Sequence, residues 1–347
     1  MIKNKRILHI SNFDIGLYKP SVSYYSCDNK ISLGFIKNNN IVKEFSYNDI
    51  LRMNSLVDSR KYFQKKGLNI LYKTTEYFQP EIIVLGHVNI PRQVLKNIKE
   101  ISNNAKIICW YVDPPEINRM ERYKSIQDLI DVLFATSGGE TLKQIKKTLH
   151  KVPKICFFPN PVDSSIEYLE SFNNFEHKFD VLYCGSDSRY KNRTNFFHTT
   201  TELTKNLNWF LAGLMNKPKV FGEHYYKAMS QTSFGINISK FYPNNFDFYS
   251  SDRIAQLIGN GLLTFNQKFP RMKELLDFDN KTIFEKPEEL SRNLNYFKNN
   301  PSEAKEVARQ NHEQYHRLYS SKIICEYFLD VLYENNLEKY HWSNEIY

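Results

Sequence analysis

The chain has 347 residues, which is long for one hydrophobic core and typical of two domains. Its net charge of +9 favours an anionic partner, such as a nucleotide phosphate, a lipid diphosphate or an anionic membrane surface. The sequence has no run of about 20 apolar residues that would span a membrane, and no Arg-rich tract or zinc-finger spacing that would indicate nucleic acid as the partner.

The cysteines and the N-terminal residues indicate a compartment. The five cysteines are odd in number and far apart, and three of them lie in apolar runs. This pattern is typical of buried thiols in a reducing compartment, and no His/Cys cluster has the spacing of a metal site. The first residues lack the apolar core and the cleavage site of a signal peptide. We therefore expect a cytoplasmic protein, whose charge permits peripheral contact with an anionic membrane at the inner face of the cell membrane.

The first half of the chain alternates apolar strand patterns with helical patterns. The run EIIVL at residues 81–85 is continuous and apolar, as expected for a strand in a sheet that is covered on both faces. The alternation has the spacing of βαβ units, so we expect a doubly wound α/β domain over residues 1–165. The predicted strands cover residues 6–11, 41–45, 81–85, 106–112, 133–137 and 154–158.

A polar segment at residues 162–177 indicates the connection to a second domain. The alternation of strands and helices then restarts, so we expect another α/β domain over residues 175–335 with a helical C-terminus. The predicted strands of this half cover residues 180–183, 209–213, 234–238, 262–265 and 282–285, and the last predicted helices cover residues 287–297, 301–318 and 321–333.

The stretch at residues 249–265, YSSDRIAQLIGNGLLTF, contains a polar turn, an amphipathic helix and a strand. Ser251 and Asp252 are good N-cap residues, and Arg253 opens the helix. The glycines that follow are typical of a helix that ends in a left-handed turn. A helix N-terminus with free N–H groups, hydroxyls and a guanidinium is an anion site, although the same pattern also fits an ordinary capped helix that packs on a sheet.

Doubly wound domains bind their ligands beyond the carboxyl ends of the strands, so the residues at these positions are the candidates for a site. The first half offers acid and base groups there, whereas the second half offers cations and hydroxyls. A nucleoside diphosphate on the second half, with the chemistry in a cleft between the domains, would explain both sets. The candidates are Asp14, His87 and Asp113 in the first half, and Gly185, Ser186, Arg189, Lys191, Arg193, Asn237, Ser239, Ser251, Asp252 and Arg253 in the second.

Each acid or base candidate of the first half has an alternative interpretation. His87 follows a buried strand, where it is either a general base or an ordinary satisfied polar residue. Asp113 precedes two prolines that would hold it at the edge of a cleft, but it would equally well cap the following turn. Asp14 is either a base or a residue that bonds to its own loop backbone. The residues leave the choice among these three open.

The segment at residues 185–193, GSDSRYKNR, follows a predicted strand and contains three cations. It does not match a P-loop, which needs the pattern GxxxxGK[ST]. The alternative to a phosphate-binding turn is a solvated loop. Two such elements in one half favour the phosphate-binding turn.

A series of motifs runs in order along nearly the whole chain, through residues 5–335. The first half contains ISLGFIKNNNIVKEFS, EIIVLGH, CWYVDPPE, LFATSGGE and FFPNPVD, and the second contains DVLYCGS, VFGEHYYKAMSQTSFGINIS and SSDRIAQLIGNGLLTF. This order resembles that of the GT-B glycosyltransferases, and specifically of the bacterial group 1 (CgeB-like) glycosyltransferases. The resemblance implies two Rossmann-like domains that face a cleft, with a nucleotide-sugar donor on the second, an acceptor on the first, no required metal or other cofactor, and a last helix that crosses back to the first domain.

The resemblance also implies roles for individual residues. Gly185, Lys191 and Arg193 would hold the diphosphate, and Gly222 and Glu223 would lie near the base and the ribose. Ser251, Asp252 and Arg253 would contact the phosphate or the sugar of the donor.

The chain departs from this family at a pair of glutamates. Many retaining members carry two glutamates separated by seven residues, and Phe248 and Gln256 stand at the corresponding positions here. A glutamine still bonds a ribose hydroxyl, and Asp247 is a candidate substitute for the first glutamate. The departure leaves both the donor sugar and the stereochemical outcome open.

The sequence therefore predicts a glycosyltransferase that moves a sugar from a nucleotide donor to a surface glycan of the bacterial cell envelope. The glycan is of the polysaccharide, O-antigen or capsule type, either lipid-linked or free. Nucleic acid is not expected as a partner. Two alternatives are a non-catalytic two-domain protein that binds a phosphorylated ligand and a nucleotide-sugar epimerase. Transfer activity would exclude the first, and conversion of the donor without an acceptor would reveal the second.

Overall fold

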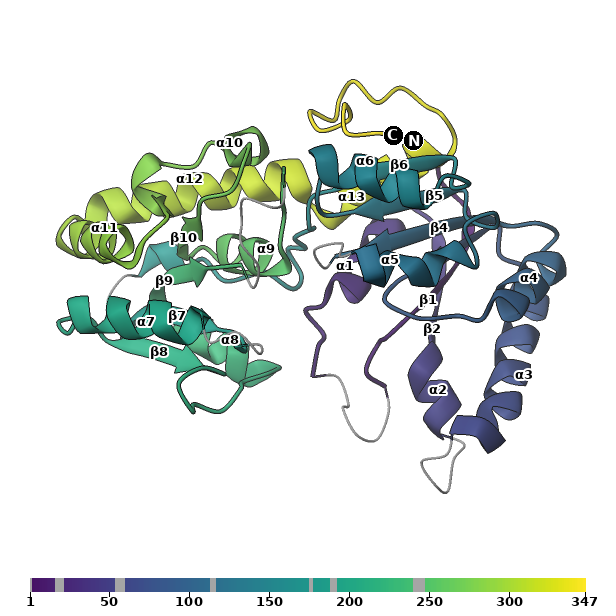
Figure 1. Ribbon diagram of the computed structural model, residues 1–347, viewed down its shortest axis with the longest axis horizontal. Helices are drawn as coiled ribbons and strands as arrows, with labels where there is room; N and C mark the ends of the chain where they lie inside the picture. Colours follow the sequence, from purple (N-terminus) through teal and green to yellow (C-terminus); the bar gives the residue numbers. More distant parts are fainter. Residues whose placement is uncertain are drawn as a thin grey trace. The chain divides into compact units, whose positions relative to one another are not determined.

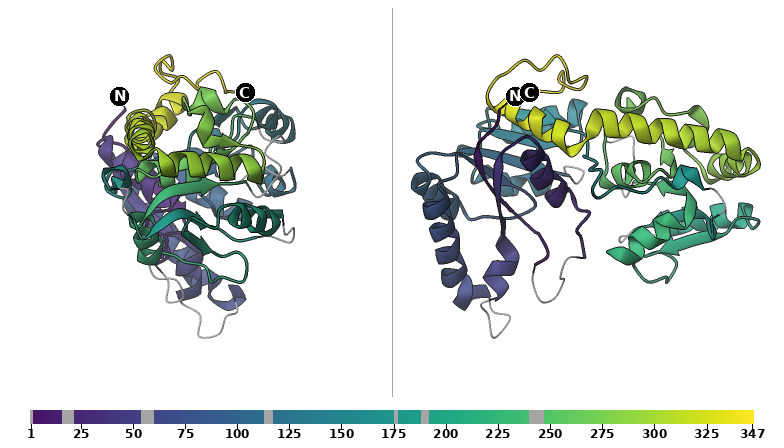
Figure 2. Two further views of the ribbon diagram at one scale, coloured as in Figure 1. Left: turned by 90° about the vertical axis from the view of Figure 1, so that its left-hand side faces the viewer. Right: turned by 180° about the vertical axis from the view of Figure 1, so that it is seen from behind.

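The computed structural model describes residues 2–15, 22–53, 60–112, 117–174, 177–187, 192–239 and 247–347, without the side chains of residues 60–64 and 117–119. The chain divides into two compact units (Figures 1 and 2). Unit 1 comprises Met1–Pro161 together with Ser321–Tyr347, and unit 2 comprises Val162–Ser320. Each unit is built around one sheet with its own core.

The sheet of unit 1 is parallel and has the strand order β2-β1-β3-β4-β5-β6 (Figure 1). β2 lies on one side of β1 and β3 on the other, so the direction in which the chain adds strands reverses between β1 and β3. Ligands of such sheets bind at the carboxyl edge beside this reversal. The strands are β1 (Arg6–Ser11), β2 (Ile41–Ser46), β3 (Ile82–Leu85), β4 (Lys106–Tyr111), β5 (Val132–Ala135) and β6 (Lys154–Phe157), and the helices are α1 (Cys27–Lys37), α2 (Tyr47–Met53), α3 (Arg60–Phe78), α4 (Arg92–Ile101), α5 (Ile117–Lys124), α6 (Gly139–Thr148) and α13 (Ser321–Leu332).

The C-terminal segment Ser321–Tyr347 completes unit 1. Phe328 of α13 stacks on Phe134 of β5, with the ring centroids 3.9 Å apart. The last residues pair with the edge strand β6. The N–H of Ile155 donates to the carbonyl of Tyr347 at 2.8 Å, and the N–H of Tyr347 donates to the carbonyl of Ile155 at 2.9 Å. This segment therefore covers both a face and an edge of the sheet, and it removes an unpaired strand edge.

The sheet of unit 2 is also parallel, with the order β11-β10-β9-β7-β8. Here the reversal lies between β7 and β9. Phe265 packs edge to face on both Phe234 and Phe297 in the core of this unit. The strands are β7 (Phe179–Cys184), β8 (Trp209–Ala212), β9 (Thr232–Asn237), β10 (Leu263–Gln267) and β11 (Ile283–Phe284), and the helices are α7 (Asn192–Leu203), α8 (Glu223–Ser230), α9 (Asp252–Gly259), α10 (Met272–Leu275), α11 (Pro287–Asn299) and α12 (Pro301–Tyr319).

The predicted fold class is confirmed, and each predicted strand is present, with small shifts at the ends. The helix α5 was not predicted, because its sequence, INRMERYK, is mostly polar and follows two prolines. The residues predicted to connect the domains begin inside unit 2, where the N–H of Val162 donates to the carbonyl of Tyr319 at 3.0 Å. None of the helices in the described ranges is both long and apolar enough to cross a membrane.

Candidate functional site

The reversal point of unit 2 brings two loop backbones into close approach. Gly185 follows β7, and its N–H donates to the carbonyl of Ala212 at the end of β8 at 3.0 Å. Gly213 has a φ of +78°, and a Cβ there would lie 2.6 Å from the carbonyl oxygen of Gly185. Only glycine fits this left-handed position without strain, so the backbones of the two loops pack directly against each other at the carboxyl edge.

The hydroxyl of Tyr183 lies next to Gly185 in these loops. The residue is 0% exposed, and its hydroxyl has no hydrogen-bond partner among the described residues. A Cβ at Gly185 would lie 2.7 Å from this hydroxyl and 2.9 Å from an Nη of Arg253. A buried hydroxyl without a partner costs about 1–3 kcal/mol, so a ligand that accepts its hydrogen bond next to Gly185 would recover that free energy.

Arg253 supplies a positive charge at the same point. Its guanidinium lies over the ring of Tyr183, with its central carbon 5.1 Å from the ring centroid, and one Nη donates to the carbonyl of Ile238 at 3.1 Å. The side chain is only partly exposed. These contacts hold the guanidinium beside Gly185 and leave further N–H donors for a ligand.

The N-terminus of α9 lies in the same loop cluster. Ser251 is the N-cap: its hydroxyl accepts the N–H of Ile254 at 3.2 Å and donates to the side-chain oxygen of Asn237 at 3.2 Å. Asn237 in turn donates to the side-chain oxygen of Asn266 at 3.2 Å. The polar chain fixes the helix start, whose free N–H groups and dipole favour an anion.

Arg193 holds the loops together rather than facing outward. It donates to the carbonyls of Ser186 at 3.0 Å, Ile238 at 2.6 Å and Ser239 at 3.2 Å, and it is 7% exposed. Burial lowers the pKa of this guanidinium to about 10, so it remains charged at neutral pH. The contact of Arg193 with a diphosphate stays a prediction, because the contacts observed here join the ends of β7 and β9.

The carboxylates predicted near the sugar have protein partners. Asp252 accepts a hydrogen bond from the amide of Gln256 at 3.0 Å, and Gln256 is 6% exposed. Asp247 forms an ion pair with Arg271 at 3.5 Å. The roles of Gln256 in ribose binding and of Asp247 in place of a glutamate stay predictions, and both side chains would have to share or change these partners.

The start of α8 lies at the same carboxyl edge. Gly222 is its N-cap and has a φ of +56°, and the carbonyl of Gly222 accepts the N–H of Tyr225 at 3.0 Å. Glu223 opens the helix and is exposed. Ser239 contributes its backbone, since its N–H donates to the side chain of Gln267 at 3.1 Å. Glu223 is thus open to a ligand, whereas Gly222 is buried and the backbones of Gly222 and Ser239 are engaged in hydrogen bonds.

Two predicted bases follow the neighbouring strands of the reversal point in unit 1, Asp14 after β1 and His87 after β3. His87 accepts the N–H of Val112 at its Nε2 at 3.3 Å, and its ring centroid lies 5.4 Å from that of Trp110. The carbonyl of His87 accepts a bond from the side chain of Asn12 at 2.8 Å. The nitrogen that would act as a base is therefore already engaged with the backbone.

Asp14 lies in a loop that the neighbouring elements hold on both sides. The N–H of Phe13 donates to the hydroxyl of Ser46 at 3.0 Å, and the N–H of Ile15 donates to Asp49 at 3.0 Å. Asp14 itself has a φ of +49° and is half-buried, and no hydrogen bond or ion pair of its carboxylate is found within the described ranges. A non-glycine residue in the left-handed region is uncommon and often marks a functional position.

The remaining predictions cannot be placed. Asp113, Arg189 and Lys191 lie outside the described residues. The described part of the chain holds no group of three His, Cys, Asp or Glu side chains arranged to bind a metal ion.

Sequence reasoning missed two residues that the structure brings to the reversal points. Nothing in the sequence marks Tyr183 as a site residue apart from its position near the end of a predicted strand. His9 lies inside β1, where its Nδ1 bonds Ser32 at 2.8 Å and its Nε2 accepts the indole N–H of Trp110 at 3.3 Å. Burial lowers the pKa of His9 to about 3, so it is a neutral core residue.

Known proteins resemble the chain in one part of its sequence and in its whole fold. Residues 177–330 match the family model described as "Glycosyl transferase-like". No curated protein sequence matches the chain significantly.

Among solved structures, an alpha-glucosyltransferase in complex with UDP and a 13-mer DNA has a TM-score of 0.67 and 13% identity, covering 95% of this chain and 100% of that chain. Anabaena HepE in complex with UDP-glucose has a TM-score of 0.58 and 11% identity, covering 95% and 100%. T4 phage BGT in complex with UDP and Mn²⁺ has a TM-score of 0.54 and 12% identity, covering 94% and 99%. Residues 177–330 of the chain thus match a glycosyl transferase-like domain, and the chain has the fold of the GT-B glycosyltransferases, as the sequence resemblance implied.

Proposed function

We propose that the chain transfers a sugar from a uridine diphosphate sugar to a hydroxyl group of an acceptor. The observation that carries this proposal is the convergence of the Tyr183 hydroxyl, the Arg253 guanidinium and the N-terminus of α9 beside Gly185. All of them lie at the reversal point of unit 2, within the residues that match the glycosyl transferase-like family. Uridine is proposed because the names of the similar structures include UDP or UDP-glucose.

In this proposal the leaving diphosphate binds against Gly185. Arg253 and the N–H groups at the start of α9 neutralise the charge that develops on it, and the Tyr183 hydroxyl donates to a phosphate oxygen. Fixed donors of this kind stabilise the transition state without reorganisation. Glu223, at the start of α8, is free to bond the ribose.

An inverting transfer also needs a base that takes the proton of the acceptor hydroxyl, and we propose Asp14 for this role. Its carboxylate has no described partner, whereas Nε2 of His87 already accepts a backbone N–H. Changing Asp14 to Asn removes the base but keeps the size of the side chain, so the turnover number should fall at least 100-fold while UDP affinity stays unchanged. Retained turnover would remove Asp14 as the base, and a retaining product would make a base of this kind unnecessary.

We propose a glycan of the bacterial cell surface as the acceptor, handled in the cytoplasm or at the inner face of the membrane. Two of the similar alpha-glucosyltransferase structures are complexes with DNA, so DNA is the second candidate acceptor. Incubation of the enzyme and labelled UDP-glucose with both lipid-linked oligosaccharide and hydroxymethylated DNA separates the two. Label in the glycan alone supports the proposal, and label in the DNA replaces it.

We also propose that Arg253 and the helix N-terminus make a metal unnecessary for transfer. The similar structure of T4 phage BGT is a complex with UDP and Mn²⁺, so the metal independence proposed for this chain requires its own test. Transfer rates should be equal in EDTA and in MnCl₂. A rate that needs Mn²⁺ would assign the charge neutralisation to the metal.

The experiment that tests the function as a whole is a thermal-shift screen with UDP, dTDP, GDP, ADP and CMP, followed by a turnover assay with the sugar form of the best ligand. A ligand at about 100 times its dissociation constant adds about 2.7 kcal/mol of stability, which shifts the melting temperature measurably. Binding followed by transfer supports the proposal. Binding without turnover leaves a two-domain binding protein, and conversion of the donor without an acceptor leaves an epimerase.

A further inference from the structure

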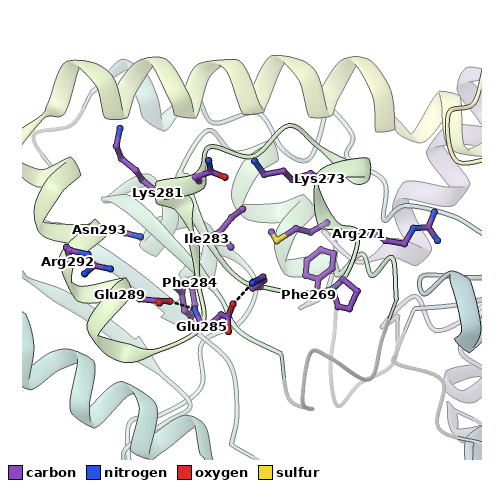
Figure 3. Close-up of a pocket in the computed structure, with 14 residues that line it drawn as sticks. Phe269, Arg271, Lys273, Lys281, Ile283, Phe284, Glu285, Glu289, Arg292 and Asn293 are labelled. Carbon is purple, nitrogen blue, oxygen red and sulfur yellow. Dashed lines mark hydrogen bonds and ion pairs between the residues drawn. The ribbon is translucent and has the colours of Figure 1, made fainter.

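Unit 2 has a second hollow beyond the carboxyl ends of β10 and β11, beside the first turns of α11 (Figure 3). Its volume is about 710 Å³, within the range of small-molecule sites. Five cationic side chains line it, and we call it the basic pocket. They are Lys268, Arg271, Lys273, Lys281 and Arg292.

Two of these cations are left without an ion pair. Lys268 pairs with Glu285 at 2.5 Å and Lys281 with Glu303 at 2.8 Å. Lys273 of α10 and Arg292 of α11 are exposed, extend from different sides of the pocket in Figure 3, and form no ion pair with any described residue. The five cations outnumber the two carboxylates that line the pocket, Glu285 and Glu289, so an anionic group would be attracted to it.

The same pocket also offers hydrogen-bond acceptors. Glu285 and Glu289 line it, and the carboxylate of Glu289 accepts the N–H of Glu285 at 2.8 Å. This hydrogen bond lowers the pKa of Glu289, so that its carboxylate stays ionised and can accept further bonds from hydroxyl groups. Asn280 and Asn293 add side-chain amides at the wall.

The mixture of charges favours a saccharide over a nucleic acid. A nucleic-acid backbone carries a negative charge at every nucleotide and prefers a surface of cations with exposed rings for its bases, whereas this pocket also presents the carboxylates of Glu285 and Glu289. The aromatic side chains of the pocket, Phe269 and Phe284, are 4% and 1% exposed and present no face for stacking. A ligand with many hydroxyls and one or two negative charges satisfies both sets of groups.

We propose that the basic pocket binds an anionic saccharide, carrying a carboxylate or a phosphate, that forms part of the acceptor. Arg271 connects the pocket to the candidate donor site: it lines the pocket, forms an ion pair with Asp247 at 3.5 Å, and lies over the ring of Phe248 at 4.9 Å. Asp247 and Phe248 lie just before the N-cap Ser251 of α9. The choice of a saccharide as the ligand rests on the proposed function. The proposal places a second saccharide site on the same unit as the donor site.

The test measures binding by calorimetry without any donor, so that it does not depend on transfer. The probes are a trimeric oligogalacturonide, glucose 6-phosphate, neutral maltotriose, inorganic phosphate and a single-stranded DNA oligomer. The variant Lys273→Gln with Arg292→Gln removes the two unpaired charges. The variant Lys305→Gln with Arg317→Gln makes the same change of charge at exposed positions of α12, and UDP binding to each variant shows that its donor site is intact.

We expect at least one of the two anionic saccharides to bind to the wild type and to the control, with the dissociation constant raised at least fivefold in the pocket variant. Whether the oligogalacturonide or glucose 6-phosphate binds more tightly identifies the anionic group. Equal affinity in both variants overturns the proposal. So does binding of inorganic phosphate as tight as that of the saccharides, or preferential binding of maltotriose or DNA. Failure of UDP to bind the wild type would instead remove the proposed function.

Discussion

At the scale of single residues, the proposed site contains polar groups that are buried without an ordinary partner or held in an uncommon backbone conformation. Tyr183 has a buried hydroxyl without a described partner, and Asp14 has a left-handed backbone. Both features cost free energy in the absence of a ligand, and both lie at the reversal point of a parallel sheet. Their coincidence with the positions where such sheets bind ligands is the physical reason to regard them as functional.

His9 leads to a prediction about acid stability. Because burial lowers its pKa to about 3, while the unfolded residue titrates near 6.5, the unfolded state binds the proton first as the pH falls. The stabilising contribution of neutral His9 is therefore fully present above about pH 6.5 and is lost progressively below it. The loss should approach about 1.4 kcal/mol per pH unit between about pH 6 and the folded pKa.

The measurement is urea unfolding of the wild type and of His9→Gln from pH 7 to pH 4, compared as a difference so that other titrating groups cancel. The difference in unfolding free energy should shrink as the pH falls. The exposed residue His150 supplies the control for the substitution itself, measured as His150→Gln over the same pH range. Parallel curves for His9→Gln and the wild type would show that His9 titrates normally in the folded state.

These residues also show which features of the site can be predicted from the sequence and which cannot. The positions of Gly185 and Arg253 were predictable, because the end of a strand and the start of a helix leave local signals. The contacts of Arg193 with three carbonyls were not, because a buried guanidinium looks the same in sequence as one that faces a ligand. Nor did any local signal indicate the ion pair of Asp247 with Arg271, which joins positions from different loops.

At the scale of elements, the start of α9 combines a structural role with a functional one. Ser251 caps the helix and bonds Asn237 of β9, so it positions the N-terminus beside Arg253. Changing Ser251 to Ala should lower the unfolding free energy by about 1 kcal/mol, as loss of an N-cap does. Changing Ser251 to Asp should keep the cap and most of the stability, but it places a negative charge where the diphosphate is proposed to bind.

Unfolding and UDP titration of the two variants separate these roles. Ser251→Asp should be nearly as stable as the wild type and bind UDP at least 10-fold more weakly, because like charges repel. An Asp variant that binds UDP as tightly as the wild type would place the diphosphate elsewhere. An Ala variant with unchanged stability would show that the cap is dispensable.

The elements themselves were largely predictable. Continuous apolar runs such as that of β3 identify buried parallel strands, and each predicted strand formed, including the edge strand β2, whose sequence IVKEFS contains two charged residues. The exception, α5, has a polar sequence whose helical form depends on the tertiary structure. The order of strands in each sheet, and hence the reversal point, follows from pairing that the sequence does not display.

At the scale of the whole molecule, the two units differ in how the chain builds them. Unit 2 is a continuous segment whose ends meet, since the N–H of Val162 donates to the carbonyl of Tyr319. Unit 1 is discontinuous, and its sheet is covered by α13 and edged by the last residues, including Tyr347. A fragment of residues 1–161 therefore leaves the apolar surface around Phe134 uncovered.

We accordingly expect a fragment of residues 162–320 to fold by itself and to bind UDP within about threefold of the affinity of the full chain. The fragment of residues 1–161 should instead aggregate, because an exposed apolar face of a sheet drives association. Circular dichroism, gel filtration and UDP titration of both fragments check these outcomes. Loss of UDP binding in a folded fragment of residues 162–320 would show that unit 2 alone does not form the nucleotide site.

Calorimetric titration of UDP into the wild type, Arg253→Ala and Arg253→Lys tests most directly whether the donor diphosphate binds beside Arg253. We expect UDP to bind the wild type, and to bind Arg253→Ala at least 10-fold more weakly, because a guanidinium beside the diphosphate is lost. Arg253→Lys should fall between them, since it keeps the charge but not the fork of donors. Equal UDP affinity in the wild type and in a folded Arg253→Ala variant would contradict the account.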